Sequence, residues 1–396
     1  MNSLVTEVGY ISLNKKGEQL CGDRVEMIEH DDNLTLVLAD GLGSGVKANI
    51  LSTLTSKIIA TMMANGMPVS ECVHTIASTL PVCSQRHVAY STFTIIQISN
   101  NQEAYLVQYD NPKAILLREG VSVDYPATEQ VIDGKKILFS TIRLEPEDIF
   151  ITMSDGALYA GVGMSLNFGW GWENIVEYME AQYEPGLTAK TACALLSEEC
   201  NHLYGSQPGD DTTVAAIRIR QRQQVNLMIG PPKDPADCDR MVGLFLSKEG
   251  KRVVCGGTTS GIVADRLGKR VTTSLDYSDP EIPPIGHIDG IDLVTEGVVT
   301  LSRVVEYARA YTDADDVTAD GWKYKKDGAS LVAQMLFETA TDINFFVGKA
   351  INPAHQNPNP VSYTHLSVYF PGDSPGSAGG GQPLPTPWIP QRSSRA

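Results

Sequence analysis

The segment TLVLADGLGSGVKAN at residues 35–49 constrains the fold more than any other part of the sequence. It continues an apolar run that begins at Leu34 and suits a strand covered on both faces. Asp40 stands at the end of this strand, and the glycines that follow allow a tight turn and close approach of the backbone to a ligand. A DGxGxG sequence also occurs in calcium loops and in ordinary turns. Its role therefore depends on partners elsewhere in the chain.

Three further acidic groups lie at the ends of predicted strands, each beside a glycine: Asp23, Asp155, and the pair Asp210 and Asp211. Strand ends that are far apart in the sequence can converge in space. Carboxylate oxygens with few histidines are the ligands that Mg²⁺ or Mn²⁺ prefers, and they are not typical of a zinc site. Because crowded carboxylates repel one another, a bound cation is the natural reason to gather them.

This set of motifs resembles the metal-dependent (PPM-type, type 2C) serine/threonine protein phosphatases, and among them the bacterial stage II sporulation protein E branch. The matching motifs stand in the family's order: GD at Asp23, LADGLGSG at Asp40, ITMSDG at Asp155 and GDDTTVAAI at Asp210. The segment DNPKAILLREG at residues 110–120 is similar to the hairpin ahead of the third motif. The resemblance also implies that the two helices after the second motif flank the metal site and regulate it. Two helices that simply cover a sheet account for the pattern equally well.

The resemblance implies a phosphatase that needs no side-chain nucleophile. We expect Asp40 to bridge two Mn²⁺ or Mg²⁺ ions and to be the central catalytic residue. Asp23 and the backbone carbonyl of Gly41 are expected to complete the coordination of the first ion. Two further carboxylates, Asp155 and Asp210, are expected to complete the coordination of the second. Two ions about 3.5 to 4 Å apart lower the pKa of a shared water, and this metal-bound water is the expected nucleophile.

Three neighbouring residues have less certain assignments in this scheme. The eukaryotic members place a phosphate-binding arginine ahead of the first acidic motif, where this chain has QLCG at residues 19–22. Arg24 and Lys47 are the candidates to replace that arginine. Asp211 is a candidate ligand for a third ion, although we favour a structural role in its turn.

The charge balance limits the partners of the chain. Among 396 residues, 47 acidic residues outnumber 31 basic ones, so the net charge of -16 argues against nucleic acid as the main partner. Such a surface also gives divalent cations a favourable field. The chain opens without a basic-then-apolar leader and contains no apolar run long enough to cross a bilayer, so we predict a cytoplasmic protein with no membrane partner. Seven cysteines without CxxC spacing favour reduced thiols.

The hydrophobic patterns in the first part of the chain predict an α+β fold. The resemblance makes this a PPM-type β-sandwich flanked by helices, over residues 1–222. We expect strands at residues 25–28, 34–39, 90–98, 103–109, 114–118, 136–140, 148–153 and 214–219, and helices at 46–64, 69–80, 172–181 and 189–204. On the helix at 46–64, the expected buried stripe is Ile50, Leu51, Leu54, Ile58 and Ile59.

Beyond a solvated connector at residues 221–224, strands and helices alternate and predict a smaller α/β domain with a mainly parallel sheet, over residues 223–351. Its role is unknown. The expected strands are 225–229, 252–255, 292–295 and 342–347, and the expected helices are 235–247, 259–267, 301–310 and 329–339.

The segment CGGTTS at residues 255–260 lies between a predicted strand and a predicted helix. Amides and hydroxyls at a helix start can hold an anion. The segment has neither a Walker lysine nor a full GxGxxG, so we favour helix capping by Thr or Ser. With VTEG at residues 294–297, it resembles an appendage of clostridial members of the same phosphatase branch.

Residues 352–396 are rich in Pro, Gly and Ser, which predicts a disordered tail. Within it, PVSYTHL at residues 360–366 resembles translated sequencing-library adapter. We therefore treat the sequence from residue 360 as an artefact and give it no role in the function.

The expected substrate is a phosphoserine or phosphothreonine on a bacterial signalling protein. Relatives in this branch act on small proteins such as anti-sigma-factor antagonists, and a homodimer is the oligomer that we carry as a candidate. One alternative is a weakly active or inactive signalling scaffold whose second domain binds a partner or nucleotide. Another is hydrolysis of a small phosphorylated metabolite, which predicts comparable turnover of free phosphoamino acids.

Overall fold

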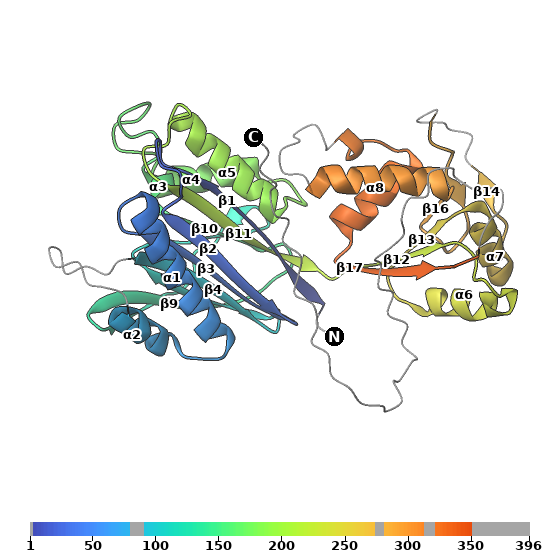
Figure 1. Ribbon diagram of the computed structural model, residues 1–396, viewed down its shortest axis with the longest axis horizontal. Helices are drawn as coiled ribbons and strands as arrows, with labels where there is room; N and C mark the ends of the chain where they lie inside the picture. Colours follow the sequence, from blue (N-terminus) through green and yellow to red (C-terminus); the bar gives the residue numbers. More distant parts are fainter. Residues whose placement is uncertain (1–2, 80–90, 274–280, 313–320, 351–396) are drawn as a thin grey trace, which may run out of the picture.

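The computed structural model describes residues 3–79, 91–273, 281–312 and 321–350. The predicted tail at 352–396 lies outside these residues. Figure 1 shows two bodies, each with its own sheets and helices, joined where strand β11 passes into strand β12. No helix in the described ranges combines the length and the apolarity that a membrane crossing requires.

Two antiparallel sheets form the centre of the first body, as predicted. The first sheet has the strand order β1 (Leu4–Leu13), β11 (Thr212–Gln221), β10 (Ile149–Met153), β6 (Ile115–Arg118), β7 (Val121–Ser122). The second has the order β2 (Asp23–His30), β3 (Asn33–Gly41), β4 (Ser91–Ser99), β5 (Glu103–Tyr109), β9 (Lys135–Arg143), β8 (Thr128–Ile132).

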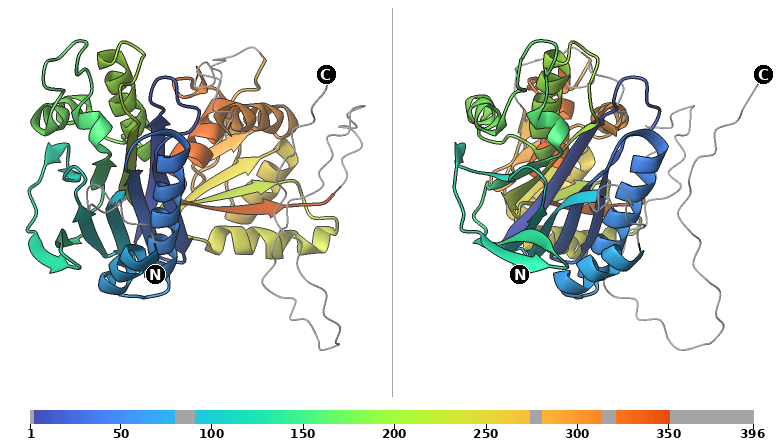
Figure 2. Two further views of the ribbon diagram at one scale, coloured as in Figure 1. Left: turned by 60° about the vertical axis from the view of Figure 1, so that its left-hand side comes forward. Right: turned by 90° about the vertical axis from the view of Figure 1, so that its left-hand side faces the viewer.

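Helices cover both outer faces of this sandwich (Figure 2). Side chains of the first sheet pack against α4 (Trp172–Gln182) and α5 (Ala189–Leu203). The second sheet packs against α1 (Gly45–Ala64) and α2 (Val69–Thr79). A single helical turn, α3 (Asp155–Leu158), follows β10. The predicted α+β sandwich is therefore confirmed.

Strand β3 shows why its sequence is apolar without interruption. Leu36 and Leu38 lie in the core between the two sheets, whereas Val37 and Ala39 lie in the core beneath α1 and α2. Successive side chains of a strand point to opposite faces, and both faces are covered here. By the same alternation, Asp40 faces the gap between the sheets.

Helix α1 is confirmed in its extent, but its predicted buried stripe is wrong in part. Leu51 and Ile59 are buried, whereas Ile50 and Leu54 are 52% and 44% exposed. Small residues such as Ala48, together with Ser52, Thr55 and Ser56, occupy much of the buried face. Small side chains allow the helix to lie close to β2 and β3, and the apolar pattern alone does not reveal this.

The second body contains one mixed sheet with helices on both faces, as Figure 1 shows. Its strand order is β14 (Thr272–Thr273), β15 (Gly286–His287), β16 (Leu293–Thr295), β13 (Lys251–Cys255), β12 (Gln224–Ile229), β17 (Asp342–Val347). The last four are mutually parallel and the first two pair antiparallel at the edge. The predicted, mainly parallel sheet is present.

Two helical layers enclose that sheet. One face packs against α8 (Val298–Thr312), α9 (Gly328–Ala333) and the π-helical turn η3 (Gln334–Thr339). The other packs against α6 (Cys238–Ser247), which follows the short η1 (Pro235–Asp237), and α7 (Gly257–Leu267). The helix predicted at residues 329–339 is thus divided into α9 and η3.

The connector between the two bodies is held more firmly than a solvated link. Arg222 Nη1 lies 2.8 Å from Asp342 Oδ1 on β17, and Arg222 Nη2 lies 3.1 Å from Asp32 Oδ1 beside β3. A hydroxyl from Thr341 also accepts a hydrogen bond from the amide of Gln223. The charged side chain therefore ties the connector to both bodies.

Candidate metal centre

Two carboxylates of the candidate centre come from neighbouring strands of one sheet. Asp23 at the start of β2 is paired in register with Asp40 near the end of β3. Residues directly opposite each other in an antiparallel pair carry their side chains on the same face. This face is the inner one, because Val25 on β2 and Leu38 on β3 belong to the core between the sheets.

The facing sheet supplies the other carboxylates. Asp155 is the first residue of α3 and is separated from β10 by Ser154 alone, and Asp210 and Asp211 immediately precede β11. Since β10 and β11 are adjacent and antiparallel, the end of one and the start of the other meet at one edge. The four sequence motifs therefore gather at one end of the gap between the sheets.

The glycines of the second and third motifs are required by close packing. A side chain on Gly41 would place its Cβ 2.1 Å from the carbonyl oxygen of Ala48 in α1. A side chain on Gly156 would place its Cβ 2.1 Å from the carbonyl oxygen of Asp211. Glycine at these positions lets α1 and the start of β11 approach the acidic residues.

Hydrogen bonds through Ser154 join the two sheets at the centre. The Ser154 hydroxyl donates to Asp23 Oδ2 at 2.7 Å and accepts from the amide of Thr213 at 2.9 Å. Asp23 is only 3% exposed. One oxygen of this carboxylate is thereby fixed by the protein.

Two buried carboxylate oxygens lack an N–H or hydroxyl donor. Among the described residues, neither Asp23 Oδ1 nor Asp211 Oδ2 accepts a hydrogen bond from an N–H or hydroxyl group, although the Asp23 carboxylate lies close enough to the Asp40 carboxyl to share a proton with it. Leaving a buried polar atom unsatisfied costs about 1 to 3 kcal/mol, and more for a charged group. A hard divalent cation would satisfy such oxygens, so the donor set fits Mg²⁺ or Mn²⁺.

The electrostatics show how closely the acids interact. Burial raises the pKa of the Asp40 carboxyl above its usual range, and the charges of Asp23, Asp155 and Asp210 raise it further. Burial also raises the pKa of Asp155, as do the charges of Asp210 and Asp110. A bound cation would offset this repulsion.

The carboxylate side chains of the candidate centre do not converge on one point in this structure. In the part of the chain that the structure describes, no three His, Cys, Asp or Glu side chains are grouped so that they could hold an ion. Asp210 Oδ1 instead lies 3.2 Å from the ammonium of Lys15. Binding an ion would therefore require carboxylates such as Asp210 to reorient.

The structure separates the roles of the two adjacent aspartates. Asp210 Oδ1 accepts a hydrogen bond from the amide of Asp211 at 3.1 Å, so it is Asp210 that caps the turn. Asp211 Oδ1 accepts from the amide of Lys15 at 2.9 Å and so holds the loop that follows β1. The turn role that we favoured for Asp211 is therefore taken by its neighbour.

Neither predicted substitute for the phosphate-binding arginine lies among the acids. Arg24 follows Asp23 on β2, so alternation directs it to the opposite face, where its Nη2 lies 3.7 Å from Glu26 Oε2. Lys47 is exposed in the first turn of α1. Sequence reasoning missed two other charged residues at the centre, Lys15 and Asp110. The turn DNP that contains Asp110 was a visible signal, whereas Lys15 stood in no motif.

The glycine-rich segment of the second body is not capped as predicted. Gly256 is the N-cap of α7, with φ of 106° and no side-chain cap. Thr259 and Ser260 are buried inside the helix, and the Ser260 hydroxyl donates to the Gly256 carbonyl. The prediction of a Thr or Ser cap is therefore wrong, because the helix begins at Gly257, ahead of these hydroxyls.

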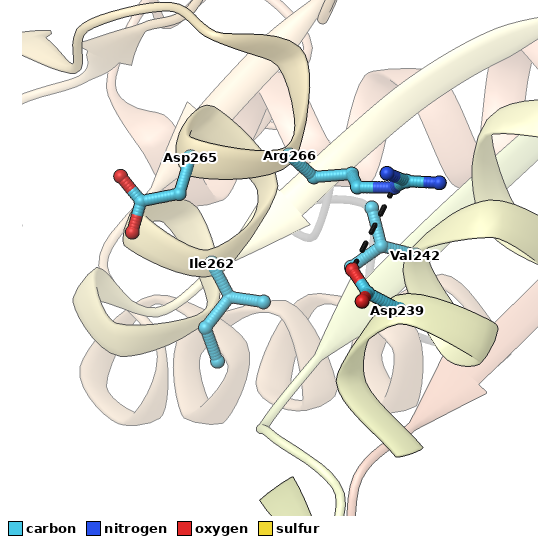
Figure 3. A pocket seen from close by; sticks show the side chains of 5 residues that line it. All are labelled: Asp239, Val242, Ile262, Asp265 and Arg266. Carbon is cyan, nitrogen blue, oxygen red and sulfur yellow. Dashed lines mark ion pairs between the residues drawn. The ribbon is translucent and has the colours of Figure 1, made fainter. Parts of the chain in front are cut away.

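A hollow in the second body is separate from the carboxylate centre. It lies between α6 and α7 and has a volume of ≈ 340 Å³. Its lining residues are Asp239, Val242, Ile262, Asp265 and Arg266 (Figure 3). Arg266 Nε lies 3.7 Å from Asp239 Oδ1, and both side chains are more than half exposed. Such a solvated pair gives the hollow little binding energy.

Several solved structures are similar to the chain. The phosphatase domain with a regulatory fragment of the cell fate determinant SpoIIE from Bacillus subtilis is 22% identical, with a TM-score of 0.48. The match covers 56% of this chain and 65% of that chain, which is less than two thirds of its length. The RsbU and RsbW domains of a Mycobacterium tuberculosis protein are 15% identical, with a TM-score of 0.46, and the match covers 61% of this chain and 69% of that one.

A third similar structure is the catalytic domain of the serine/threonine phosphatase PstP in complex with two manganese ions. It is 16% identical, with a TM-score of 0.39, over 55% of this chain and 100% of that chain. No curated protein matches the chain.

A family model matches a continuous stretch of the sequence. The model is that of stage II sporulation protein E, and it matches residues 30–220. The matched stretch contains the motifs of Asp40, Asp155 and Asp210, whereas Asp23 precedes it. Residues 30–220 are therefore similar in sequence to the stage II sporulation protein E family of phosphatases.

Proposed function

We propose that residues 1–222 hydrolyse phosphoserine or phosphothreonine on a bacterial signalling protein and that two Mn²⁺ or Mg²⁺ ions serve the reaction. The observation that carries this proposal is the pair of buried oxygens, Asp23 Oδ1 and Asp211 Oδ2, that accept no hydrogen bond from an N–H or hydroxyl group of the described residues. They lie among acids whose mutual repulsion raises the pKa of Asp40 beyond the effect of burial. Such an arrangement destabilises the folded state, and a bound cation would offset this destabilisation.

The residues have separable tasks in this proposal. Asp40, Asp23, Asp155 and Asp210 would hold the two ions, together with the carbonyl of Gly41. Asp211 Oδ2 would be available to a third ion. When bound, two such ions lower the pKa of a water molecule and offset charge on phosphoryl oxygens. Ser154 keeps Asp23 oriented through its 2.7 Å hydrogen bond. Gly41 and Gly156 keep the surrounding backbone close to the acids.

The proposed substrate rests on the resemblance to this family. Members of this branch act on small signalling proteins, and we propose a phosphoprotein of the anti-sigma-factor antagonist type. The net charge of -16 disfavours nucleic acid as the substrate. Residues 223–351 form an accessory domain in this proposal, and a homodimer is the candidate assembly.

The test is phosphate release from a phosphothreonine peptide by the full chain, with Mn²⁺, with Mg²⁺ and with chelator. Asp40→Asn and Asp155→Asn are the test variants. Asp124→Asn is a matched control, because Asp124 is 86% exposed in its side chain and pairs with Lys113. We expect metal-dependent release that both test variants lose and the control keeps. Free phosphothreonine, assayed in parallel, should be a much poorer substrate.

Three results would contradict the proposal. Release that persists in chelator would exclude the metal mechanism. Equal turnover of free phosphothreonine would favour a metabolite phosphatase. A wild-type chain that binds Mn²⁺ but releases no phosphate with any metal would favour a signalling scaffold.

A further inference from the structure

The loop between β1 and β2 carries a lysine into the acidic centre. Lys15 Nζ lies 3.2 Å from Asp210 Oδ1, and the backbone amide of Lys15 donates to Asp211 Oδ1 at 2.9 Å. Asp210 and Asp211 are separated from Lys15 by about half the length of the chain, so the fold brings them into contact. The side chain of Lys15 is 35% exposed and can therefore be reached from solvent.

Contacts on both sides of the centre hold this loop in place. The amide of Lys16 donates to the carbonyl of Pro208 at 2.8 Å, next to β11. Glu18 Oε1 accepts a hydrogen bond from the Ser44 hydroxyl at 3.0 Å, at the start of α1. The position of Lys15 is thus fixed by the sheet that carries Asp210 and by the helix that follows the second motif.

Among the described residues, three other basic side chains near the centre lack this placement. Arg24 lies on the opposite face of β2 and pairs with Glu26. Lys47 is exposed in the first turn of α1. The neighbouring Lys16 is exposed and donates to Gln207 Oε1 at 2.7 Å, outside the cluster of acids. Lys15 therefore has the position that the two predicted substitutes lack.

A lysine ammonium has three donors and no acceptor, and a single carboxylate oxygen occupies one of them. Phosphoryl oxygens are strong acceptors for such a charged donor. If Asp210 turns toward a divalent cation, its oxygen becomes less available to Lys15. The ammonium is then left beside the acids with its donors directed at whatever anion enters the centre.

We propose that Lys15 is a substrate-binding residue that contacts a phosphoryl oxygen of the phosphorylated side chain. This inference rests on the proposed phosphatase function. It assigns the phosphate-binding role to the loop after β1, ahead of the first acidic motif. It also makes Asp210 the resting partner of Lys15, so the lysine is poised next to the site before substrate arrives.

The test compares full-length Lys15→Ala, Lys15→Arg and Lys16→Ala with the wild type. Calorimetry with inorganic phosphate, in saturating Mn²⁺, measures the phosphate contact directly. We expect Lys15→Ala to bind phosphate at least about 10-fold more weakly, as for loss of a charge-assisted hydrogen bond. Lys15→Arg should retain most of the affinity, and Lys16→Ala should match the wild type.

A second titration, with Mn²⁺ alone, separates substrate binding from support of the acids. Removing the competing ammonium from Asp210 should leave the Mn²⁺ affinity of Lys15→Ala equal to or higher than that of the wild type. In peptide assays the same variant should show a raised KM. Phosphate affinity that is unchanged in Lys15→Ala would overturn the inference. So would Mn²⁺ binding that weakens in parallel with phosphate binding, because Lys15 would then be a structural support.

The failure of the inference can be told from the failure of the function. If the wild type releases phosphate from peptide and Lys15→Ala does so with the same KM, only the role of Lys15 is refuted. If the wild type neither binds phosphate nor releases it with any metal, the phosphatase proposal fails and the assignment of Lys15 fails with it.

Discussion

Both bodies of the molecule place buried acidic residues at the ends of elements, but they use these acids differently. In the second body, Asp327 is 4% exposed, and its two oxygens accept from the amide and the hydroxyl of Ser330 at the start of α9. In the first body, Asp23 and Asp211 are 3% and 5% exposed, and each keeps one oxygen that accepts from no N–H or hydroxyl group among the described residues. These three carboxylates are buried to nearly the same degree, but only Asp327 has such a hydrogen bond to each of its oxygens.

For Asp23 and Asp211, this difference separates candidate functional acids from structural ones where sequence context does not. Glu296 follows a strand and precedes a glycine, as Asp155 does, yet its carboxylate accepts from two amides in the first turn of α8. Capping of this kind is a common use of an acid at a helix start. An acid whose oxygen stays buried without a donor points to a ligand instead.

The largest expected effect comes from a matched pair of substitutions. Asp155→Asn should lower the rate of phosphopeptide hydrolysis at least about 100-fold, since even residues behind the ligands change metal affinity or activity by about 10 to 100-fold. Asp327→Asn should leave the rate unchanged, because Asp327 caps α9 in the other body. Steady-state kinetics in saturating Mn²⁺ provide the measurement. A similar loss in both variants would mean that the acids of the candidate centre and the capping acid of the second body are not functionally distinct.

Metal addition should stabilise one body and not the other. At a Mn²⁺ concentration 100 times the Kd, binding to the folded state contributes about 2.7 kcal/mol. Hydrogen exchange followed by mass spectrometry can compare β3, which ends in the centre, with β12, which does not. We expect slower exchange in β3 alone. Equal slowing in β12 would show that the centre is coupled to the second sheet, and no change in β3 would argue against the metal site.

Much of the fold could be predicted because it is encoded locally. The uninterrupted apolar run in β3 indicates a strand covered on both faces, and both faces are covered. Strand β8 was missed, since four of its five side chains are exposed and the fifth is intermediate, which leaves no inward periodicity to detect. The exposed Ile50 and Leu54 show the converse case, in which apolar residues satisfy a helical pattern without being buried.

The position of the acidic motifs at strand ends could be predicted, because Asp40, Asp155 and Asp210 each stand beside a glycine where an apolar strand begins or ends. The charged residues that contact these acids could not be predicted. Lys15 meets Asp210 only because β1 and β11 are paired in one sheet, and Asp110 acts on Asp155 through space. Long-range contacts of single charged residues leave no periodic signal in a sequence. The assignment of Arg24 failed for a simpler reason, since alternation along β2 directs it away from the face that carries Asp23.

A smaller effect is expected from the capping acid of the second body. Asp327→Ala removes both hydrogen bonds to Ser330 and should destabilise that body by about 1 to 2 kcal/mol, the usual range for a lost N-cap. Asp289→Ala is the control, because Asp289 is 75% exposed in its side chain and pairs with Lys269 on the surface. Urea unfolding followed by exchange of α9 amides reports the change. An equal response to both substitutions would show that the cap contributes no more than an exposed ion pair.

The smallest effect has the opposite sign. Burial raises the pKa of Asp23, and the charge of Asp211 raises it further, so the ionised carboxylate is held in the folded state at a cost. Asp23→Asn keeps an oxygen that can accept from Ser154 and removes the charge. In chelator we therefore expect this variant to be more stable than the wild type, by about 1 kcal/mol.

The sign of that change should reverse when metal is added. In excess Mn²⁺ the wild type gains the binding free energy, whereas Asp23→Asn gains less because a ligand oxygen has lost its charge. The urea midpoint of Asp23→Asn should therefore be higher than that of the wild type in chelator and lower than that of the wild type in Mn²⁺. Asp148→Asn is the contrasting variant, since Asp148 is fully buried but is already bound by Arg118 at 2.8 Å. It should destabilise the protein in both conditions, because it weakens a satisfied ion pair. If Asp23→Asn behaved like Asp148→Asn, the oxygen without an N–H or hydroxyl donor would be a structural feature, and the distinction between the two kinds of buried acid would fail at its most sensitive point.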